Sequence, residues 1–398
     1  GVVPGARQVC LRAPSKRLYV PPMTTSDELE SFESFEEDSE EDSSGGGPNA
    51  KPWDPSKIRI DTKNFTLREV GLQIQEGELD LAPDFQRDYV WKARQQTRLI
   101  ESVLLGIPLP AFYFNQERER LQVVDGVQRL TTISNFMRGE FRLELGSLEY
   151  LKDLSGKTFS ELDPQLQRRF SKTQIVVHVI EPQTPDGVKY DIFSRVNTGG
   201  SPLSAQEIRH AMSKAPSRNF LKQLVDLPSF SAATGGWFLP INGGNRRMMD
   251  RELALRFCAF YVTPLDEYRT YESLDSFLLA FTRKIDSSDR AIDFDHLARS
   301  FDTAMKNAFT AFDKSAFRRR VKGRRSPLNR AVFEAQAIAL ADKSPPAVTE
   351  NASALKAAFA TLLDQEEFSA SVTVGTGDSK KVKTRLEQAA AAVRSVLG

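Results

Sequence analysis

The sequence predicts an α+β fold, with short strands and helices mixed in the first half of the chain and a mostly helical second half. Two observations carry this prediction. Short apolar runs typical of buried strands occur at 111–114, 121–124 and 174–180. From Ser204 onward, candidate helices follow one another, and only 368–374 suggests a strand. We therefore expect a domain with a small sheet over 53–203 and a helical domain over 204–398.

The composition is that of an ordinary globular protein. Of 398 residues, 40% are hydrophobic and 27% are charged, and no run approaches the roughly 18 apolar residues of a membrane helix. Two cysteines, Cys10 and Cys258, exclude a disulfide framework and fit a reducing cytoplasm. Three isolated histidines, His178, His210 and His296, lack the spacing of a histidine–metal nuclease motif.

The charge is unevenly distributed. Ten acidic residues and no basic ones lie between Asp27 and Asp42, so the rest of the chain carries +11 although the whole carries only +1. We expect residues 1–52 to form a disordered acidic tail. This tail either aids solubility or covers a basic face of the body and competes there with nucleic acid. Met23 resembles a natural start, which leaves residues 1–22 as an upstream extension or as vector-derived sequence.

The first expected domain begins with a helix that Thr66 caps together with Glu69, and this helix ends at Gly77. Pro83 keeps the following segment extended. An amphipathic helix over 92–105 is followed by the runs 111–114 and 121–124, which we expect to pair as a hairpin. Further helices are expected at 162–170 and 187–196, on either side of the buried strand 174–180.

A glycine loop, Asn197-Thr-Gly-Gly200, leads to a second capping box, formed by Ser204 and Glu207. Beyond it the chain predicts one helix after another. These helices are expected at 204–214, 217–226, 247–262, 273–284, 289–311, 326–343, 350–364 and 379–396.

The segment 121–133 carries the strongest chemical signal. It predicts a short strand, an Asp125-Gly126 turn and a helix that starts near Val127. A strand that enters a helix through glycine presents free backbone N–H groups and a positive dipole end, which suit a phosphate. Gln128 and Arg129 lie in the first turn, and Asp125 is a candidate metal ligand or water-orienting base. The alternative is an ordinary Asp-Gly turn before a core helix.

A basic cluster follows in the helical half. Phosphate-backbone contact is one interpretation of this cluster, and a solvated loop without a ligand is the other. Its members, which we take as candidate nucleic-acid-binding residues, are Arg318, Arg319, Arg320, Lys322, Arg324 and Arg325.

Three stretches, in this order and at these separations, point to one family. They are 85–91 (Phe-Gln-Arg-Asp-Tyr-Val-Trp), 124–132 (Val-Asp-Gly-Val-Gln-Arg-Leu-Thr-Thr) and 195–204 (Arg-Val-Asn-Thr-Gly-Gly-Ser-Pro-Leu-Ser). Together they resemble the signatures of the GmrSD restriction endonuclease N-terminal domain family, once called domain of unknown function 262. The resemblance covers roughly residues 60–215.

The resemblance implies a ParB/sulfiredoxin-like fold and nucleotide binding, with hydrolysis in some members, in bacterial defence against phage or modified DNA. The family's Asp-Gly-Gln-Gln-Arg motif is matched by Asp125, Gly126, Gln128 and Arg129, whereas Val127 stands where the family usually has glutamine. Nucleotide-binding positions carried over from the other motifs are Gln86, Arg195, Asn197, Thr198, Gly199 and Gly200, and Arg87 joins the catalytic set.

The expected function is therefore binding and hydrolysis of a nucleoside triphosphate, in concert with DNA. In this mechanism Arg129 and Arg87 neutralise the charge of the phosphates, and Gln128 or Gln86 positions the attacking water. Asp125 holds a divalent metal ion, and the expected ion is Mg²⁺. Restriction members append a His-Asn-His nuclease domain that this sequence does not show. The alternative is thus a DNA or nucleotide sensor without chemistry, which depends on a partner nuclease.

Overall fold

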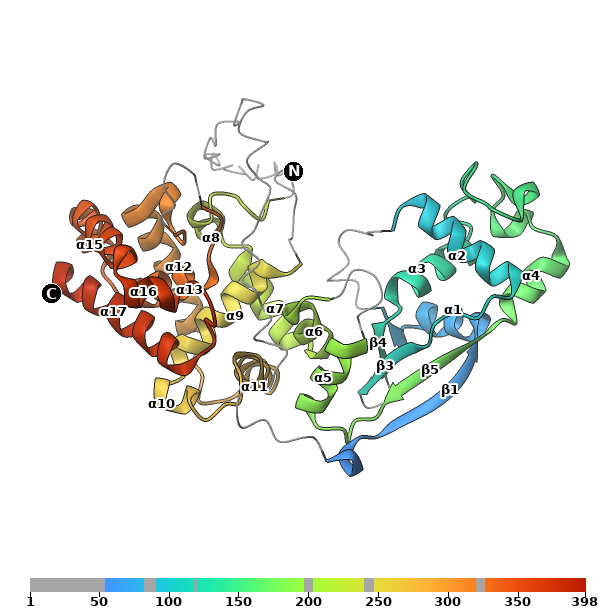
Figure 1. Ribbon diagram of the computed structural model, residues 1–398, viewed down its shortest axis with the longest axis horizontal. Helices are drawn as coiled ribbons and strands as arrows, with labels where there is room; N and C mark the ends of the chain where they lie inside the picture. The colour runs from blue at the N-terminus through green and yellow to red at the C-terminus, as the bar shows by residue number, and fades with distance from the viewer. Residues whose placement is uncertain (1–53, 82–90, 118–119, 197–202, 240–246, 320–325) are drawn as a thin grey trace, which may run out of the picture. The chain divides into compact units, whose positions relative to one another are not determined.

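The computed structural model describes residues 54–81, 91–117, 120–196, 203–239, 247–319 and 326–398. Strands and helices are interspersed up to residue 212 (Figure 1). The strands are β1 (Ile60–Thr66), β2 (Leu79–Asp80), β3 (Phe112–Glu117), β4 (Arg120–Asp125) and β5 (Gln174–Ile180). The helices of this part are α1 (Leu67–Glu76), α2 (Ala93–Leu105), α3 (Val127–Met137), α4 (Pro164–Ser171), α5 (Asp186–Val196) and α6 (Ala205–Met212).

The strands form one mixed sheet in the order β1-β5-β3-β4-β2. The pairs β1–β5 and β3–β4 are antiparallel, whereas β3–β5 and β2–β4 are parallel. The hairpin pairing of β3 with β4 shifts register between Tyr113 and Phe114. This irregularity places Tyr113 opposite Asp125, the last residue of β4, so the hairpin delivers Asp125 to the edge where α3 begins.

Each face of the sheet has its own apolar core. Helices α1 to α4 cover one face, where Phe112, Phe114 and Val123 pack against helix residues such as Ile100 and Phe136. On the other face a smaller cluster joins strand residues to α5, α6 and α11 (Leu274–Asp286). Its buried members include Val124, Ile180, Phe193, Ile208 and Leu279. Because alternate residues of β4 point to opposite faces, the hairpin contributes to both cores.

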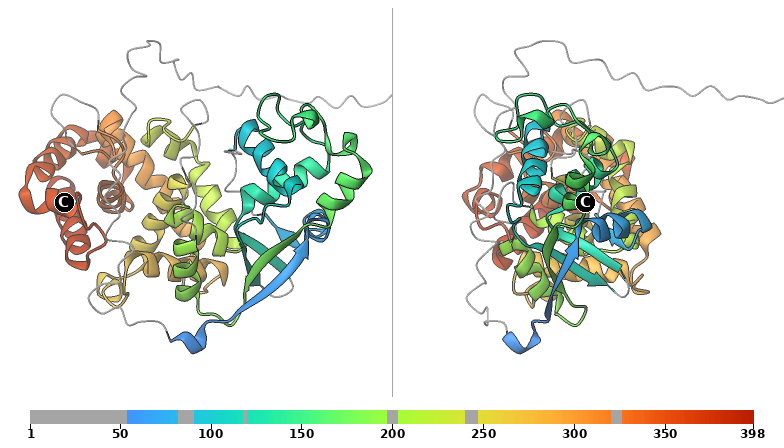
Figure 2. Two further views of the ribbon diagram at one scale, coloured as in Figure 1. Left: turned by 45° about the vertical axis from the view of Figure 1, so that its right-hand side comes forward. Right: turned by 90° about the vertical axis from the view of Figure 1, so that its right-hand side faces the viewer.

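The remainder of the described chain is helical (Figure 2). Its helices are α7 (Ala215–Val225), α8 (Pro228–Ala233), α9 (Met249–Val262), α10 (Leu265–Tyr268), α11, α12 (Phe294–Phe312), α13 (Arg330–Leu340), α14 (Pro345–Glu350), α15 (Ala352–Asp364), α16 (Glu366–Ser371) and α17 (Ser379–Leu397). Short 3₁₀ turns occur at Pro55–Lys57, Lys152–Leu154, Phe159–Glu161 and Asp313–Ser315.

A buried chain of charges joins three of these helices. Arg256 of α9 donates to Glu252, 2.8 Å away, and to Glu334 of α13 at 2.9 Å. Glu334 also accepts from Arg385 of α17 through Nε at 2.9 Å. Glu334 and Arg385 are both fully buried, so neither charge has water to replace a lost partner.

The structure confirms the α+β class with a mostly helical second half. Both predicted capping boxes are present, at Thr66 with Glu69 and at Ser204 with Glu207. The suggested strand at 368–374 is wrong, because α16 and a turn occupy it. Its buried residues Phe368, Ser371 and Val372 have the spacing of one helix face.

The expected tail over residues 1–52 lies outside the described residues. Among the helices that are described, none combines the length and the apolar character that crossing a bilayer requires.

Candidate functional site

The junction between β4 and α3 is built around Gly126. Its φ of 96° lies in the left-handed region, which residues with a side chain adopt only at a cost. A Cβ at this position would lie 2.2 Å from Cδ1 of Phe112, a ring buried in the core. Only glycine therefore lets the chain turn from strand to helix this close to β3.

Among the described residues, no side chain caps the first turn of α3. Gly126 is the N-cap residue and offers no side-chain acceptor, so the amide N–H groups of the first turn are left to other partners. The Gly126 N–H itself donates to the Asp125 carboxylate. Such a helix start carries a positive partial charge and suits an anion.

Arg129 lies beneath this turn and is held on several sides. Its Nη2 donates to Oδ2 of Asp125 at 2.8 Å and to the carbonyl of Ala111 at 3.3 Å. Its Nη1 donates to the carbonyl of Pro110, and the guanidinium lies 4.2 Å from the centroid of the Phe112 ring. Arg129 therefore fixes Asp125 against the start of β3 as well as carrying a charge.

The Asp125–Arg129 pair is partly removed from water, with 25% of the Asp125 side chain and 13% of the Arg129 side chain exposed. Burial raises the pKa of Asp125, and the positive charge of Arg129 opposes that rise. Burial likewise lowers the pKa of Arg129, against the pull of Asp125. The two shifts share one cause, since each charged form loses water that its partner only partly replaces.

Gln128 and Val127 face different surroundings. Gln128 is half-buried, and its Oε1 has no hydrogen-bond partner among the described residues. Val127 is buried and belongs to the core between α1–α4 and the sheet. The side chain that departs from the family motif thus packs inward, while the unpartnered Oε1 of the matching Gln128 is itself buried.

The other expected nucleotide contacts cannot be placed around this junction. Gln86 and Arg87 lie within 82–90, and Asn197, Thr198, Gly199 and Gly200 lie within 197–202, both outside the described residues. Arg195 is described and is exposed near the end of α5.

The basic cluster is described only in part. Arg320, Lys322, Arg324 and Arg325 lie outside the described residues. Arg318 is buried, donates to the carbonyl of Ser326 at 2.7 Å and lies over the ring of Trp237, so its charge serves the fold and is not displayed to a ligand. Arg319 is half-buried.

The three histidines lie in separate settings. His178 Nδ1 is 2.9 Å from the hydroxyl of Thr62, His210 is buried, and His296 Nε2 is 3.2 Å from the hydroxyl of Tyr261. Within the described ranges, no group of three or more His, Cys, Asp or Glu side chains could hold a metal ion.

Sequence reasoning missed a polar pocket in the helical half. Four of the residues lining it are His296, Arg299, Ser300 and Thr303. They recur at i, i+3, i+4 and i+7, which places them on one face of α12. A search for polar as well as apolar helical stripes would have found them.

Comparison with protein families agrees with the motifs. Residues 70–213 match the model of the GmrSD restriction endonuclease, N-terminal domain. This segment is therefore similar to that domain. The match runs from α1 to the end of α6 and includes the whole β4–α3 junction. No curated protein matches the chain.

Proposed function

We propose that this chain is a component of a GmrSD-type restriction system, in which the N-terminal domain binds and hydrolyses a nucleoside triphosphate and the protein acts with DNA. The family match over residues 70–213 carries this proposal. The uncapped, glycine-entered start of α3 supports the nucleotide part, since it offers N–H donors where a phosphate is expected.

In the proposed site, the first-turn amides of α3 bind phosphate oxygens and Gln128 positions the attacking water. Arg129 orients Asp125 and supplies positive charge, because two of its contacts are backbone carbonyls that lock the guanidinium in place. Arg87 and Gln86 are proposed to reach the same phosphates, and Arg195, Asn197, Thr198, Gly199 and Gly200 the nucleotide. Preorganised charges of this kind stabilise the phosphoryl-transfer transition state.

Mg²⁺ is the proposed cofactor, with Asp125 as its protein ligand. The carboxylate is a donor of the right type, and Mg²⁺ in nucleotide sites commonly takes only one or two carboxylates and completes its shell with phosphates and water. Arg129 binds Oδ2 of this carboxylate, whose remaining lone pairs are proposed to bind the ion. The metal would neutralise charge on the phosphates.

The test is phosphate release from each nucleoside triphosphate by the full chain, with and without DNA. We expect Asp125→Asn and Arg129→Ala to lower turnover by about 100-fold or more. Arg142→Ala is the matched control, because its exposed guanidinium pairs with Glu161 away from the junction. Wild-type turnover in both junction variants, with Mg²⁺ present, would exclude this assignment.

The second candidate is a sensor that binds nucleotide or DNA without hydrolysis and relies on a partner nuclease. The internal pairing of Arg129 favours it, since a guanidinium already bound to Asp125 and two carbonyls has fewer donors for a transition state. Binding of a nucleotide by the wild-type chain, with no phosphate release under any DNA condition, would select this alternative.

A further inference from the structure

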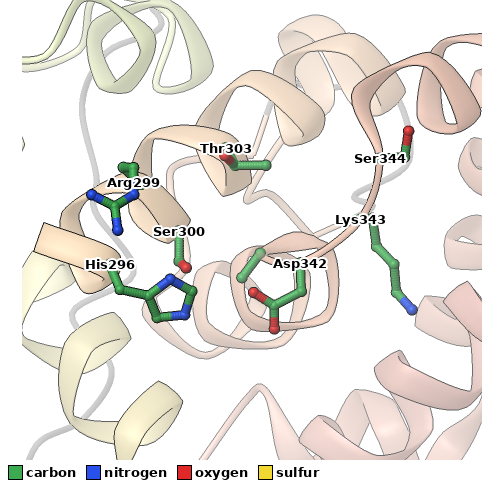
Figure 3. A pocket seen from close by; sticks show the side chains of 8 residues that line it. His296, Arg299, Ser300, Thr303, Asp342, Lys343 and Ser344 are labelled. Atoms are coloured by element: carbon green, nitrogen blue, oxygen red, sulfur yellow. The ribbon is translucent and has the colours of Figure 1, made fainter. Parts of the chain in front are cut away.

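A polar pocket of about 360 Å³ lies in the helical half, open to solvent. One wall is a face of α12 that carries His296, Arg299 and Ser300, and the other is the segment that follows α13, with Asp342 and Lys343 (Figure 3). Its volume falls at the small end of the range for ligand pockets. None of these residues belongs to the β4–α3 junction, so the pocket is a separate feature.

Tyr261 of α9 organises the pocket. Its hydroxyl donates to Oδ1 of Asp342 at 2.7 Å, and it lies 3.0 Å from Oγ of Ser300 and 3.2 Å from Nε2 of His296. Since the single hydroxyl proton goes to Asp342, the tyrosine oxygen can accept from Ser300 and His296. Burial raises the pKa of Tyr261, which keeps this proton in place.

Asn307 fixes the opposite wall. Its Nδ2 donates to the carbonyls of Leu340 and Lys343, at 3.0 and 2.9 Å. Asn307 lies on α12 and is almost fully buried. Helix α12 therefore carries one wall of the pocket and also fixes the backbone of the segment that carries Asp342 and Lys343. The pocket is therefore preorganised by hydrogen bonds beneath its surface.

The charges at the pocket favour an anion. Arg299 and Lys343 have no ion pair within the part of the chain that the structure describes, and in Figure 3 they lie on opposite sides of Asp342, with the Lys343 ammonium directed away from it. Asp342 is the only acid among the described lining residues, and the Tyr261 hydroxyl already binds one of its oxygens. Together Arg299, Lys343 and Asp342 give the described lining a formal net charge of +1, which matches the single negative charge of a phosphodiester.

We propose that this pocket binds a phosphate group, supplied by the backbone of DNA. Arg299 and Lys343 supply positive charge from the two sides of the pocket, and the hydroxyl of Thr303 adds a neutral donor. Contacts of this kind hold a protein on DNA without reading its sequence. The site rests on the proposed action with DNA, and it does not depend on whether the junction is catalytic.

The main test measures binding of the full chain to a short labelled DNA duplex by fluorescence anisotropy, between about 50 and 200 mM salt. In the double variant Arg299→Gln with Lys343→Gln, affinity at low salt should fall roughly tenfold. The slope of log affinity against log salt should fall by about 0.9 for one lost phosphate contact. The matched control is Arg290→Gln with Lys356→Gln, which removes the same charge from exposed positions outside the pocket.

The variant Tyr261→Phe tests the hydrogen bonds that order the pocket while the charges of the pocket stay unchanged. The ring remains to stack on Phe257, and both pocket cations are kept, but the hydroxyl that orders Asp342, Ser300 and His296 is lost. DNA affinity should fall in this variant too, with less change in the salt slope than in the double variant.

Inorganic phosphate, followed by ³¹P line broadening, distinguishes the source of the group. Loss of phosphate binding in the double variant with DNA binding unchanged would retain the phosphate pocket and assign it to a small free phosphate. The proposal would be overturned if the wild type, the double variant and Tyr261→Phe bound DNA with the same affinity and also bound phosphate with the same affinity. Nucleotide turnover without DNA should be unchanged in all pocket variants. A failure of the pocket proposal can therefore be told apart from a failure of the proposed hydrolysis at the β4–α3 junction.

Discussion

At the scale of single residues, the fold and the proposed site depend most directly on Gly126, because this residue has no Cβ. Gly126→Ala forces a side chain into the left-handed region and drives its Cβ into the Phe112 ring. We expect a loss of about 2–4 kcal/mol in the free energy of unfolding, from backbone strain plus overpacking. Urea denaturation monitored by circular dichroism measures this loss.

Gly139→Ala is the matched control for that substitution. Gly139 has a φ of 76°, but a Cβ there would meet nothing within 4 Å. Only the strain of about 1–2 kcal/mol should remain. Equal losses in the two variants would mean that the close approach to Phe112 does not matter.

The residue types at the junction were predictable, but their partners were not. The strand–glycine–helix pattern placed Asp125 and Arg129 one helical turn apart, which allows an i,i+4 pair. Nothing in the sequence indicates that Arg129 also binds the carbonyls of Pro110 and Ala111, because that contact depends on how β3 approaches α3. The nucleotide roles of these residues stay predictions.

At the scale of elements, the helices were predictable where caps and apolar periodicity agree. Helix α1 begins after Thr66 and ends at Gly77, as expected from its capping box and glycine. Strand β1 was missed because most of its residues are exposed and polar, so it shows no apolar alternation. The strand suggested near Phe368 failed because the buried residues Phe368, Ser371 and Val372 recur at i, i+3 and i+4, the period of a helix, and this helix packs against α17.

The buried charges between α9, α13 and α17 yield a prediction at this scale. Glu334→Ala leaves Arg256 and Arg385 without their shared carboxylate in a fully buried setting. We expect a loss of about 3–5 kcal/mol in the free energy of unfolding, measured by urea denaturation. Glu387→Ala on α17 is the control, since its exposed pair with Lys383 should contribute less than about 1 kcal/mol. A small effect at Glu334 would show that the network is dispensable.

At the scale of the whole molecule, ionisable groups tie the helical half to the sheet-containing part. Arg283 of α11 donates to both oxygens of Asp186 on α5, at 2.7 and 2.8 Å, and to the carbonyl of Met212 on α6. These contacts flank the apolar cluster that α11 shares with α5 and α6. Any force that separates α11 from α5 and α6 must therefore break charged and apolar contacts together.

Acid should destabilise the whole molecule through Glu252 of α9. Burial alone would raise its pKa, but Arg330, Arg256 and Arg209 outweigh burial and lower the pKa to about 2 from the usual 4.5. The unfolded chain therefore takes up a proton first as the pH falls. The stability that the charged carboxylate contributes is complete above pH 4.5 and is lost progressively toward pH 2.

Glu252→Gln isolates this contribution. Its free energy of unfolding should be lower than that of the wild type near neutral pH and should fall less steeply between about pH 6 and pH 3. His210, whose pKa burial lowers to about 2, also weakens the fold in acid, but it does so equally in both proteins. Glu387→Gln, at an exposed position, should keep the wild-type slope. Parallel curves for wild type and Glu252→Gln would mean that Glu252 has a similar pKa in the folded and unfolded chains, and they would contradict this prediction.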